Sequence, residues 1–282
     1  MRYIVYYEVF KKKKNSGKYW SYKPSLYKEV VRFPLLRIFY IYIFALIINN
    51  LIYQFCTPKT LSYARWIATP LGELINIFII DIALGLSAIC IGKAKLNLGT
   101  IKREKIALLT LLCILVTLTE FLPEVSLITA LSQIIGEVPE TDLIKNINVG
   151  TFFSVCILAP IVEELIFRGV VERILLKLKT SPWVGIIASA MLFAMIHKFP
   201  YQAISAFIGG VIYGWVYYKT KSIYLTFSMH AVNNIIAFIV FFLDDGVGGS
   251  DAFPPILYVF AGLSLLLFIF FIVRLSYKLK DF

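Results

Sequence analysis

Residues 148–171 decide the fold, and they read NVGTFFSVCILAPIVEELIFRGVV. The run is apolar over a length that matches the roughly 20 residues needed to cross a bilayer. Its second half nevertheless contains the adjacent carboxylates Glu163 and Glu164, followed by Arg168. A charged side chain at the centre of a bilayer costs roughly 2.5–3.5 kcal/mol on insertion scales, and such residues are usually functional. The run therefore predicts a transmembrane helix that carries a functional site.

The composition of the whole chain agrees with a membrane protein. Of the 282 residues, 59% are hydrophobic and only 16% are charged, and the mean hydropathy is +0.80. Soluble domains average about 45–50% apolar and about 25% charged residues, so a water-soluble core could not bury this surplus. The same figures exclude an intrinsically disordered chain and a disulfide scaffold, because only four cysteines are present. The expected fold class is all-α, as a polytopic membrane protein.

Apolar runs predict about eight transmembrane helices. The fifth and sixth runs are the least distinct, because only three residues separate them. The runs cover residues 34–56, 70–92, 106–122, 148–171, 182–197, 200–218, 223–242 and 255–275.

Basic residues predict the orientation of these helices. With the N-terminus inside, the inner segments contain 22 of the 28 Lys and Arg, whereas the outer connectors contain four. This asymmetry follows the positive-inside rule, so both termini are expected in the cytoplasm. The net charge of +11 is therefore a topology signal, and a nucleic-acid partner is not expected. Acidic residues are instead assigned to the outer segments: Glu124, Glu137, Glu140, Asp142, Asp244, Asp245 and Asp251.

The chain is accordingly divided into four parts. Residues 123–148 are expected to form an outer, partly amphipathic connector, and residues 243–254 an outer loop. The parts are a basic cytoplasmic segment (1–33), three helices with their outer connector (34–145), a core of four helices (146–242), and the outer loop, last helix and basic tail (243–282).

The candidate site gathers the ionisable residues of the apolar runs. On a helix, the i,i+4 spacing lets Glu164 pair with Arg168, while Glu163 points about 100° away and stays available for chemistry. The chain has only two histidines, His197 and His230, and both lie in other apolar runs. A structural ion pair with a spare glutamate explains the fourth run alone equally well, but two intramembrane histidines favour a catalytic site.

Three short motifs occur in order on separate runs. They are EExxxR (Glu163, Glu164, Arg168), FxxxH (Phe193, His197) and HxxxN (His230, Asn234). The set resembles the CAAX protease and bacteriocin-processing (CPBP or Abi) family of intramembrane endopeptidases, over about residues 150–240. Residues 1–145 resemble no family that we can name.

The resemblance implies a hydrolase with a glutamate-activated water. Glu163 is then the general base, and His197 orients the water. His230 and Asn234 donate hydrogen bonds to the oxyanion. Glu164 and Arg168 support this helix face from behind, and Phe193 belongs to the second motif. No cofactor is expected.

Two other chemistries stay open. A zinc ion held by Glu163, His197 and His230 would match the ligand types of catalytic zinc sites, although the sequence has no HExxH motif. Cys156 lies two helical turns before Glu163 and could reach the same cavity, but no base is paired with it. The cysteines are expected to serve as packing residues.

The expected protein is a multi-pass protease of a bacterial cell membrane, since Lys, Ile and Tyr are frequent, as in low-GC bacteria. Its expected partners are the lipid bilayer and peptide or membrane-protein substrates. The family suggests bacteriocin or signalling-peptide processing and bacteriocin immunity. The alternatives are a non-catalytic membrane partner of a sensor or receptor, and a proton-coupled transporter, which the absence of a visible internal repeat disfavours. The expected position of His197 is near the outer end of its run, whereas Glu163 lies nearer the inner end of its own run. The helix that carries His197 is therefore expected either to begin later than residue 182 or to be tilted or short.

Overall fold

The structure is a computed structural model that describes residues 69–135, 149–177, 181–197, 200–243 and 255–280, together with the single positions 42, 47, 51 and 54. The described residues contain helices and no strand, as expected for an all-α fold. The predicted first helix, at 34–56, lies outside the described residues apart from the four single positions. The predicted basic segment (1–33) and most of the predicted loop at 243–254 also lie outside them.

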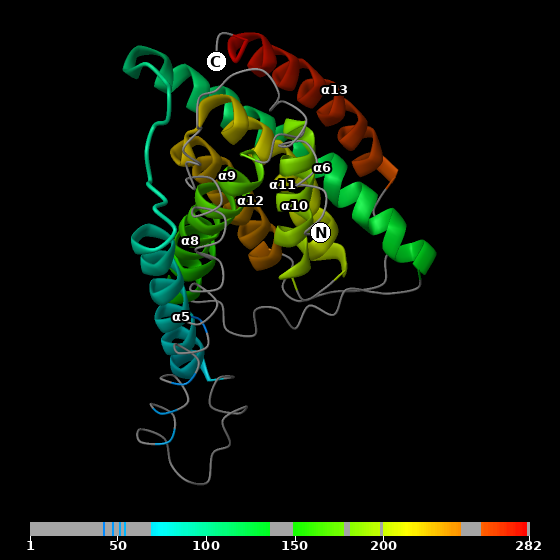
Figure 1. The fold of residues 1–282 in the computed structure, drawn as a ribbon. Helices are drawn as coiled ribbons and strands as arrows, with labels where there is room; N and C mark the ends of the chain where they lie inside the picture. The colour runs from blue at the N-terminus through cyan, green and yellow to red at the C-terminus, as the bar shows by residue number, and fades with distance from the viewer. Residues whose placement is uncertain are drawn as a thin grey trace, which may run out of the picture. The chain divides into compact units, whose positions relative to one another are not determined.

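The helices follow one another as labelled in Figure 1. A short 3-10 turn, η1, leads into α6, and two π-helical segments, η3 and η4, interrupt the fourth predicted run. The bounds are α5 Pro70–Cys90, η1 Arg103–Lys105, α6 Ile106–Ile135, α7 Val149–Phe153, η3 Ser154–Leu158, α8 Ala159–Ile166, η4 Phe167–Glu172, α9 Arg173–Leu175, α10 Pro182–Met195, α11 Pro200–Thr220, α12 Ile223–Leu243 and α13 Pro255–Lys278.

The last seven predicted runs therefore all contain helix. Among the described residues, four stretches are long and apolar enough to cross a membrane, and two shorter apolar helices accompany them. Several apolar helices indicate a membrane protein, while the count of eight spans and the cytoplasmic termini stay predictions. The four long stretches are Arg103–Leu131, Val149–Leu175, Ile223–Val240 and Ile256–Lys278, and the shorter helices are Ile75–Cys90 and Pro182–Met195.

The predicted end of the third run at residue 122 is wrong, because α6 continues through Pro123 to Ile135. A proline inside a helix leaves the carbonyl four residues earlier without its N–H partner. Here that carbonyl belongs to Thr119, and the hydroxyl of Ser264 on α13 donates to it over 2.8 Å. The lost backbone bond is replaced from a neighbouring helix, so the helix goes on. Glu124, expected in an outer connector, is instead buried in α6.

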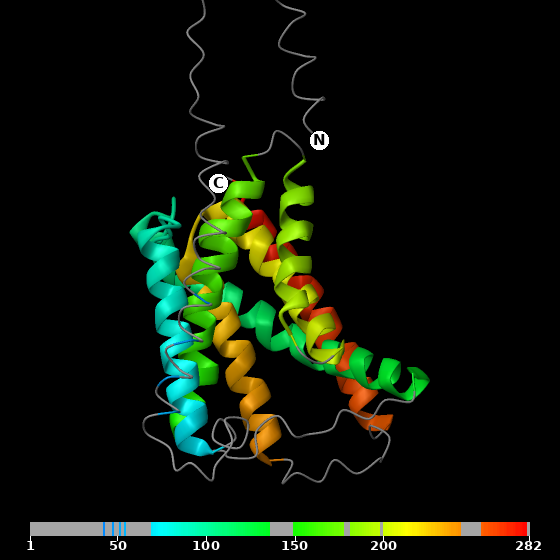
Figure 2. The same cartoon turned by 60° about the horizontal axis from the view of Figure 1, so that its bottom comes forward.

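The largest hydrophobic core joins α6, α11, α12 and α13. Leu109 and Val116 from α6, Val216 from α11 and Met229 from α12 are buried there together, and Leu275 closes the cluster from α13. Figures 1 and 2 show α13 alongside α6, and these two helices are in extensive contact. This core places one face of α11 and α12 firmly against α6.

A second core joins α5 to the helix that carries the glutamates. Figure 2 shows α5 running beside α8, and the two helices pack together. The approach is close at Gly169, where an added Cβ would lie 2.6 Å from the Cβ of Ala94. Arg173 donates hydrogen bonds to the carbonyls of Gly92 and Lys93 just beyond α5. A cation is favourable at a helix C-terminus, so Arg173 fixes α5 to this segment.

Candidate active site

The centre of the site is a buried ion pair between Glu164 and Arg168. Nη1 of Arg168 lies 2.7 Å from Oε1 of Glu164, and the side chains are 1% and 0% exposed. Nη2 of Arg168 donates to the carbonyl of Gly210 on α11 over 3.1 Å. The guanidinium also lies over the rings of Phe193 and Tyr213, 5.0 and 5.5 Å from their centroids. The i,i+4 pair expected from the sequence is present, and its charges are compensated as burial requires.

His230 on α12 lies between the two glutamates of α8. Its Nδ1 is 3.1 Å from Oε1 of Glu164, and its Nε2 is 3.5 Å from Oε2 of Glu163. Tyr213 stacks on the imidazole, with 5.7 Å between ring centroids and 28° between ring planes. The ring is therefore held in one orientation, with one nitrogen facing each carboxylate.

This arrangement fixes the proton on one side of His230. A carboxylate paired with a guanidinium acts only as an acceptor, so the hydrogen bond to Glu164 places a proton on Nδ1 of His230. Nε2 is then the nitrogen that faces Glu163. The 3.5 Å separation is longer than an ordinary hydrogen bond, and Glu163 is 25% exposed whereas Glu164 is fully buried. Glu163 is thus the glutamate that water and substrate can reach.

His197 joins the site through Phe193. The ring of Phe193 makes edge contacts with both histidines, with centroid distances of 5.0 Å to His197 and 5.5 Å to His230. Nδ1 of His197 lies 2.9 Å from the carbonyl of Phe193. A carbonyl oxygen only accepts, so Nδ1 carries the proton and Nε2 of the neutral ring is an acceptor. Of the alternatives expected for this helix, α10 does not begin later than the predicted run, because it starts at Pro182, and it is short, with 14 residues.

Asn234 holds the distorted part of the glutamate helix. In the π-helical segment the N–H of Ala159 bonds to the carbonyl of Ser154, five residues earlier, so the next such bond would join residue 160 to Val155. Pro160 has no N–H, and Nδ2 of Asn234 donates to the Val155 carbonyl instead, over 2.9 Å. One N–H of the Asn234 amide is thereby used, and a second donor is left for a ligand.

Cys156 does not face a base in the described part of the chain. It is fully buried, and its thiol lies 3.6 Å from the backbone carbonyl of Asn234. Nucleophilic cysteines are activated by a lowered thiol pKa and partial exposure, and this site provides neither exposure nor a neighbouring imidazole. Cys156 is consistent with the packing role expected for it.

The expected zinc ligands do not form a metal site as they stand. Among the described residues, no three His, Cys, Asp or Glu side chains are grouped so that they could hold one metal ion. Each nitrogen of His230 already faces a carboxylate, and Nδ1 of His197 is bonded to a carbonyl. Glu163, His197 and His230 therefore do not fit a zinc ion without rearrangement.

Four buried or half-buried acids near these helices were not identified in the sequence as part of a site. Asp81 on α5 is within electrostatic range of Glu163. Glu172 is fully buried in η4, and its carboxylate has no hydrogen-bond partner among the residues that the structure describes. Glu120 and Glu124 line a pocket beside Tyr213. Counting every acid inside the predicted runs finds Asp81 and Glu120, while Glu124 requires knowing that α6 passes through Pro123.

The segment that contains the three motifs matches a known protein family. A family model described as type II CAAX prenyl endopeptidase Rce1-like matches residues 145–236. This segment is similar to the Rce1-like family. The match confirms the resemblance to the CAAX protease family, and the Rce1-like segment contains all seven residues of the three motifs. No curated protein and no solved structure matches the chain. Asp81, Glu120 and Glu124 lie outside the Rce1-like segment.

Proposed function

We propose that the protein is a membrane-embedded endopeptidase that hydrolyses peptide bonds of membrane-associated peptides or proteins. The observation that supports it best is the position of His230 between a buried, ion-paired Glu164 and a partly exposed Glu163. One carboxylate is buried in an ion pair with Arg168 and the other is partly exposed beside His230, which is the separation of roles that general acid–base catalysis needs. The Rce1-like family match supports the same class of enzyme.

Hydrolysis would proceed by glutamate-activated water. Glu163 takes a proton from water as the oxygen attacks the carbonyl carbon of the scissile bond. In this mechanism His230 is doubly protonated: Nδ1–H stays bonded to Glu164, and Nε2–H donates a hydrogen bond to the resulting oxyanion. When the C–N bond breaks, Glu163 returns the proton to the leaving amine, so that a carboxylic acid and an amine are released.

His197 and Asn234 would complete this machinery. Nε2 of His197 accepts a hydrogen bond from the attacking water, because its Nδ1 already donates to Phe193. The remaining N–H of Asn234 adds a second donor to the oxyanion, one helical turn from His230. Both residues thereby act from helices other than that of Glu163, so the site forms only when the helices are packed together.

We propose that this chemistry uses no metal ion. The support is the engagement of the imidazole nitrogens with carboxylates and a carbonyl. The expected result is that a chelator leaves activity unchanged and that added zinc does not raise it. Inactivation by a chelator, followed by recovery with zinc, would establish the zinc alternative instead.

The proposed clients are peptide precursors or membrane-anchored proteins that are cut close to the inner leaflet. Bacteriocin or signalling-peptide processing, and immunity to a bacteriocin, are the roles proposed from the family resemblance. The proposed location is a bacterial cell membrane with several passes, which agrees with the apolar helices.

The proposal is tested with Glu163→Gln, which keeps the shape of the side chain and removes the base. We expect peptide hydrolysis to fall by roughly 10²- to 10⁴-fold, the usual contribution of a general base. Membranes from cells with the wild-type or the variant protein are compared by peptide mass spectrometry, which also identifies the clients.

The matched control is Glu104→Gln, since Glu104 is exposed in η1, far along the chain from the motifs. It is expected to keep full activity. If Glu163→Gln folds normally and keeps the cleavage products, Glu163 is not the base. If the cellular phenotype survives in a folded Glu163→Gln protein that cleaves nothing, the protein acts as a non-catalytic partner.

A further inference from the structure

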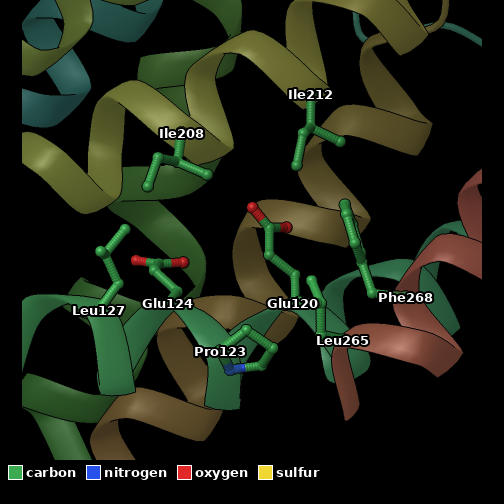
Figure 3. A pocket seen from close by; sticks show the side chains of 8 residues that line it. All are labelled: Glu120, Pro123, Glu124, Leu127, Ile208, Ile212, Leu265 and Phe268. Carbon is green, nitrogen blue, oxygen red and sulfur yellow. The ribbon is translucent and has the colours of Figure 1, made fainter. Parts of the chain in front are cut away.

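A pocket of about 170 Å³ lies between α6, α11 and α13, outside the site described above. Two carboxylates line it, and Figure 3 shows both turned toward the space between α6 and α11. The remaining lining side chains are apolar. The full lining is Glu120, Pro123, Glu124, Leu127, Ile208, Ile212, Leu265 and Phe268.

Among the described residues, the two carboxylates are buried without a cation. Glu120 is 7% exposed and Glu124 is 8% exposed, and they stand at i,i+4 on the same helix, where like charges repel. The side chains described as lining the pocket include no basic one. Two carboxylates in a low-dielectric site cannot both ionise unless a positive charge compensates them. The pocket therefore favours a positively charged occupant.

Glu120 has an acceptor that faces the empty space. Its Oε1 is buried and has no hydrogen-bond partner among the described residues, whereas Glu124 interacts with the side chain of Ser205. An unpaired buried acceptor costs roughly 1–3 kcal/mol, more for a charged group. In Figure 3 the Glu120 carboxylate points from α6 toward Ile208 and Ile212. A ligand that donates hydrogen bonds to this oxygen would remove the penalty.

The lining selects an organic cation over a metal ion. Ca²⁺ binds six to eight oxygens and Mg²⁺ about six, whereas this pocket offers two carboxylates among apolar side chains. An apolar cavity of about 150 Å³ holds a ring the size of benzene, so this volume suits an ammonium group on a short alkyl chain. The ring of Phe268 adds a surface that attracts cations.

We propose that this pocket binds a primary alkylammonium group, with its charge between Glu120 and Glu124 and its alkyl chain against Ile208, Ile212 and Phe268. Tyr213 stacks on His230 and is within electrostatic range of both pocket glutamates. Occupation of the pocket is thereby one side chain away from the proposed active site. The proposal does not depend on proteolysis.

The test measures thermal unfolding of the full-length protein in detergent with n-butylammonium chloride as the probe. We expect a concentration-dependent rise of the unfolding midpoint, because a ligand that binds the folded state stabilises it. The double variant Glu120→Gln/Glu124→Gln should weaken the fitted affinity roughly 10- to 100-fold, as expected for charge-assisted hydrogen bonds. Glu104→Gln, which alters an exposed acid, should leave it unchanged.

Two probes decide whether the charge and the alkyl chain matter. Neutral n-butanol and sodium chloride at matched concentration should not reproduce the stabilisation. Equal stabilisation by either one would overturn the proposal, as would an unchanged response of the double variant. If the double variant does not fold, Phe268→Leu replaces it. The proposal would also be overturned if butylammonium and butanol each changed the unfolding midpoint of this variant as they change that of the wild type.

The natural source of the ammonium group is then identified by competition against butylammonium. One arm uses a lysine-containing peptide and its norleucine counterpart, and the other uses vesicles of phosphatidylethanolamine or phosphatidylcholine. Competition by the lysine peptide alone identifies a peptide side chain, and competition by phosphatidylethanolamine alone identifies a lipid headgroup. Competition by neither the lysine peptide nor phosphatidylethanolamine would count against a physiological alkylammonium ligand.

Discussion

Arg168 has more partners than any other charged residue described in the site. Its guanidinium pairs with Glu164, donates to the Gly210 carbonyl, and lies over two aromatic rings. Through Glu164 it also holds Nδ1 of His230. The position of the imidazole therefore depends on a residue that itself takes no part in the proposed chemistry.

Arg168→Met is expected to destabilise the protein by about 3–5 kcal/mol, because it leaves the Glu164 carboxylate buried without its cation. Denaturant or thermal unfolding in detergent measures the loss, and Lys95→Met, at an exposed position, is the control. If Arg168→Met unfolds like the Lys95 variant, the ion pair contributes nothing measurable to stability.

Asn234→Ala is expected to lower both stability and activity, because it removes the donor to the Val155 carbonyl and the proposed oxyanion donor together. Adding Pro160→Ala restores a backbone N–H near that carbonyl. We therefore expect the double variant to recover roughly 1 kcal/mol of stability, the worth of a typical hydrogen bond, while hydrolysis stays low. Recovery of hydrolysis as well would mean that Asn234 only supports the helix.

For individual residues, the sequence predicted the motif residues of the candidate site but did not predict the pocket. The i,i+4 spacing predicted the pair of Glu164 with Arg168, and the family resemblance brought both histidines to the same site. The position of His230 between the two glutamates needed the packing of α12 against α8. No spacing rule contains that information.

Among the elements, α6 and α13 are joined by a polar contact between Thr119 and Ser264 as well as by their apolar packing. Pro123 leaves the Thr119 carbonyl unpaired within α6, and the Ser264 hydroxyl of α13 donates a hydrogen bond to it. The apolar runs predicted where both helices lie. They did not predict that α6 continues past its proline, because that depends on a donor 145 residues further along the chain.

Ser264→Ala is expected to cost about 1–3 kcal/mol, since it leaves a buried carbonyl unsatisfied. In a Pro123→Ala background the same change should cost much less, because the backbone N–H of residue 123 then serves that carbonyl. A double-mutant cycle on unfolding free energies measures the coupling. Equal costs in both backgrounds would show that the Ser264 hydroxyl acts elsewhere.

For the whole molecule, the distribution of charge predicts the orientation in the membrane. The basic segments 93–105 and 274–282 are expected on one side and the acidic loop 243–254 on the other. An epitope tag after residue 282 should bind antibody only in permeabilised cells, and a tag within 244–254 should bind it in intact cells. The reverse pattern would invert the topology, and detection of both tags on one side would change the number of spans.

The two side-chain hydrogen bonds that replace the backbone bonds lost at Pro123 and Pro160 also have a consequence for the synthesis of the chain. The donor to the Val155 carbonyl lies 79 residues further along the chain, and the donor to the Thr119 carbonyl lies 145 residues further along. Both carbonyls are therefore synthesised before the residues that donate to them. Hydrocarbon offers no water to serve them in the meantime. The nascent helices consequently carry two carbonyls that gain their donors only after α12 and α13 have been synthesised. A chain that ends before α13 would lack the Ser264 hydroxyl and leave the Thr119 carbonyl without its donor.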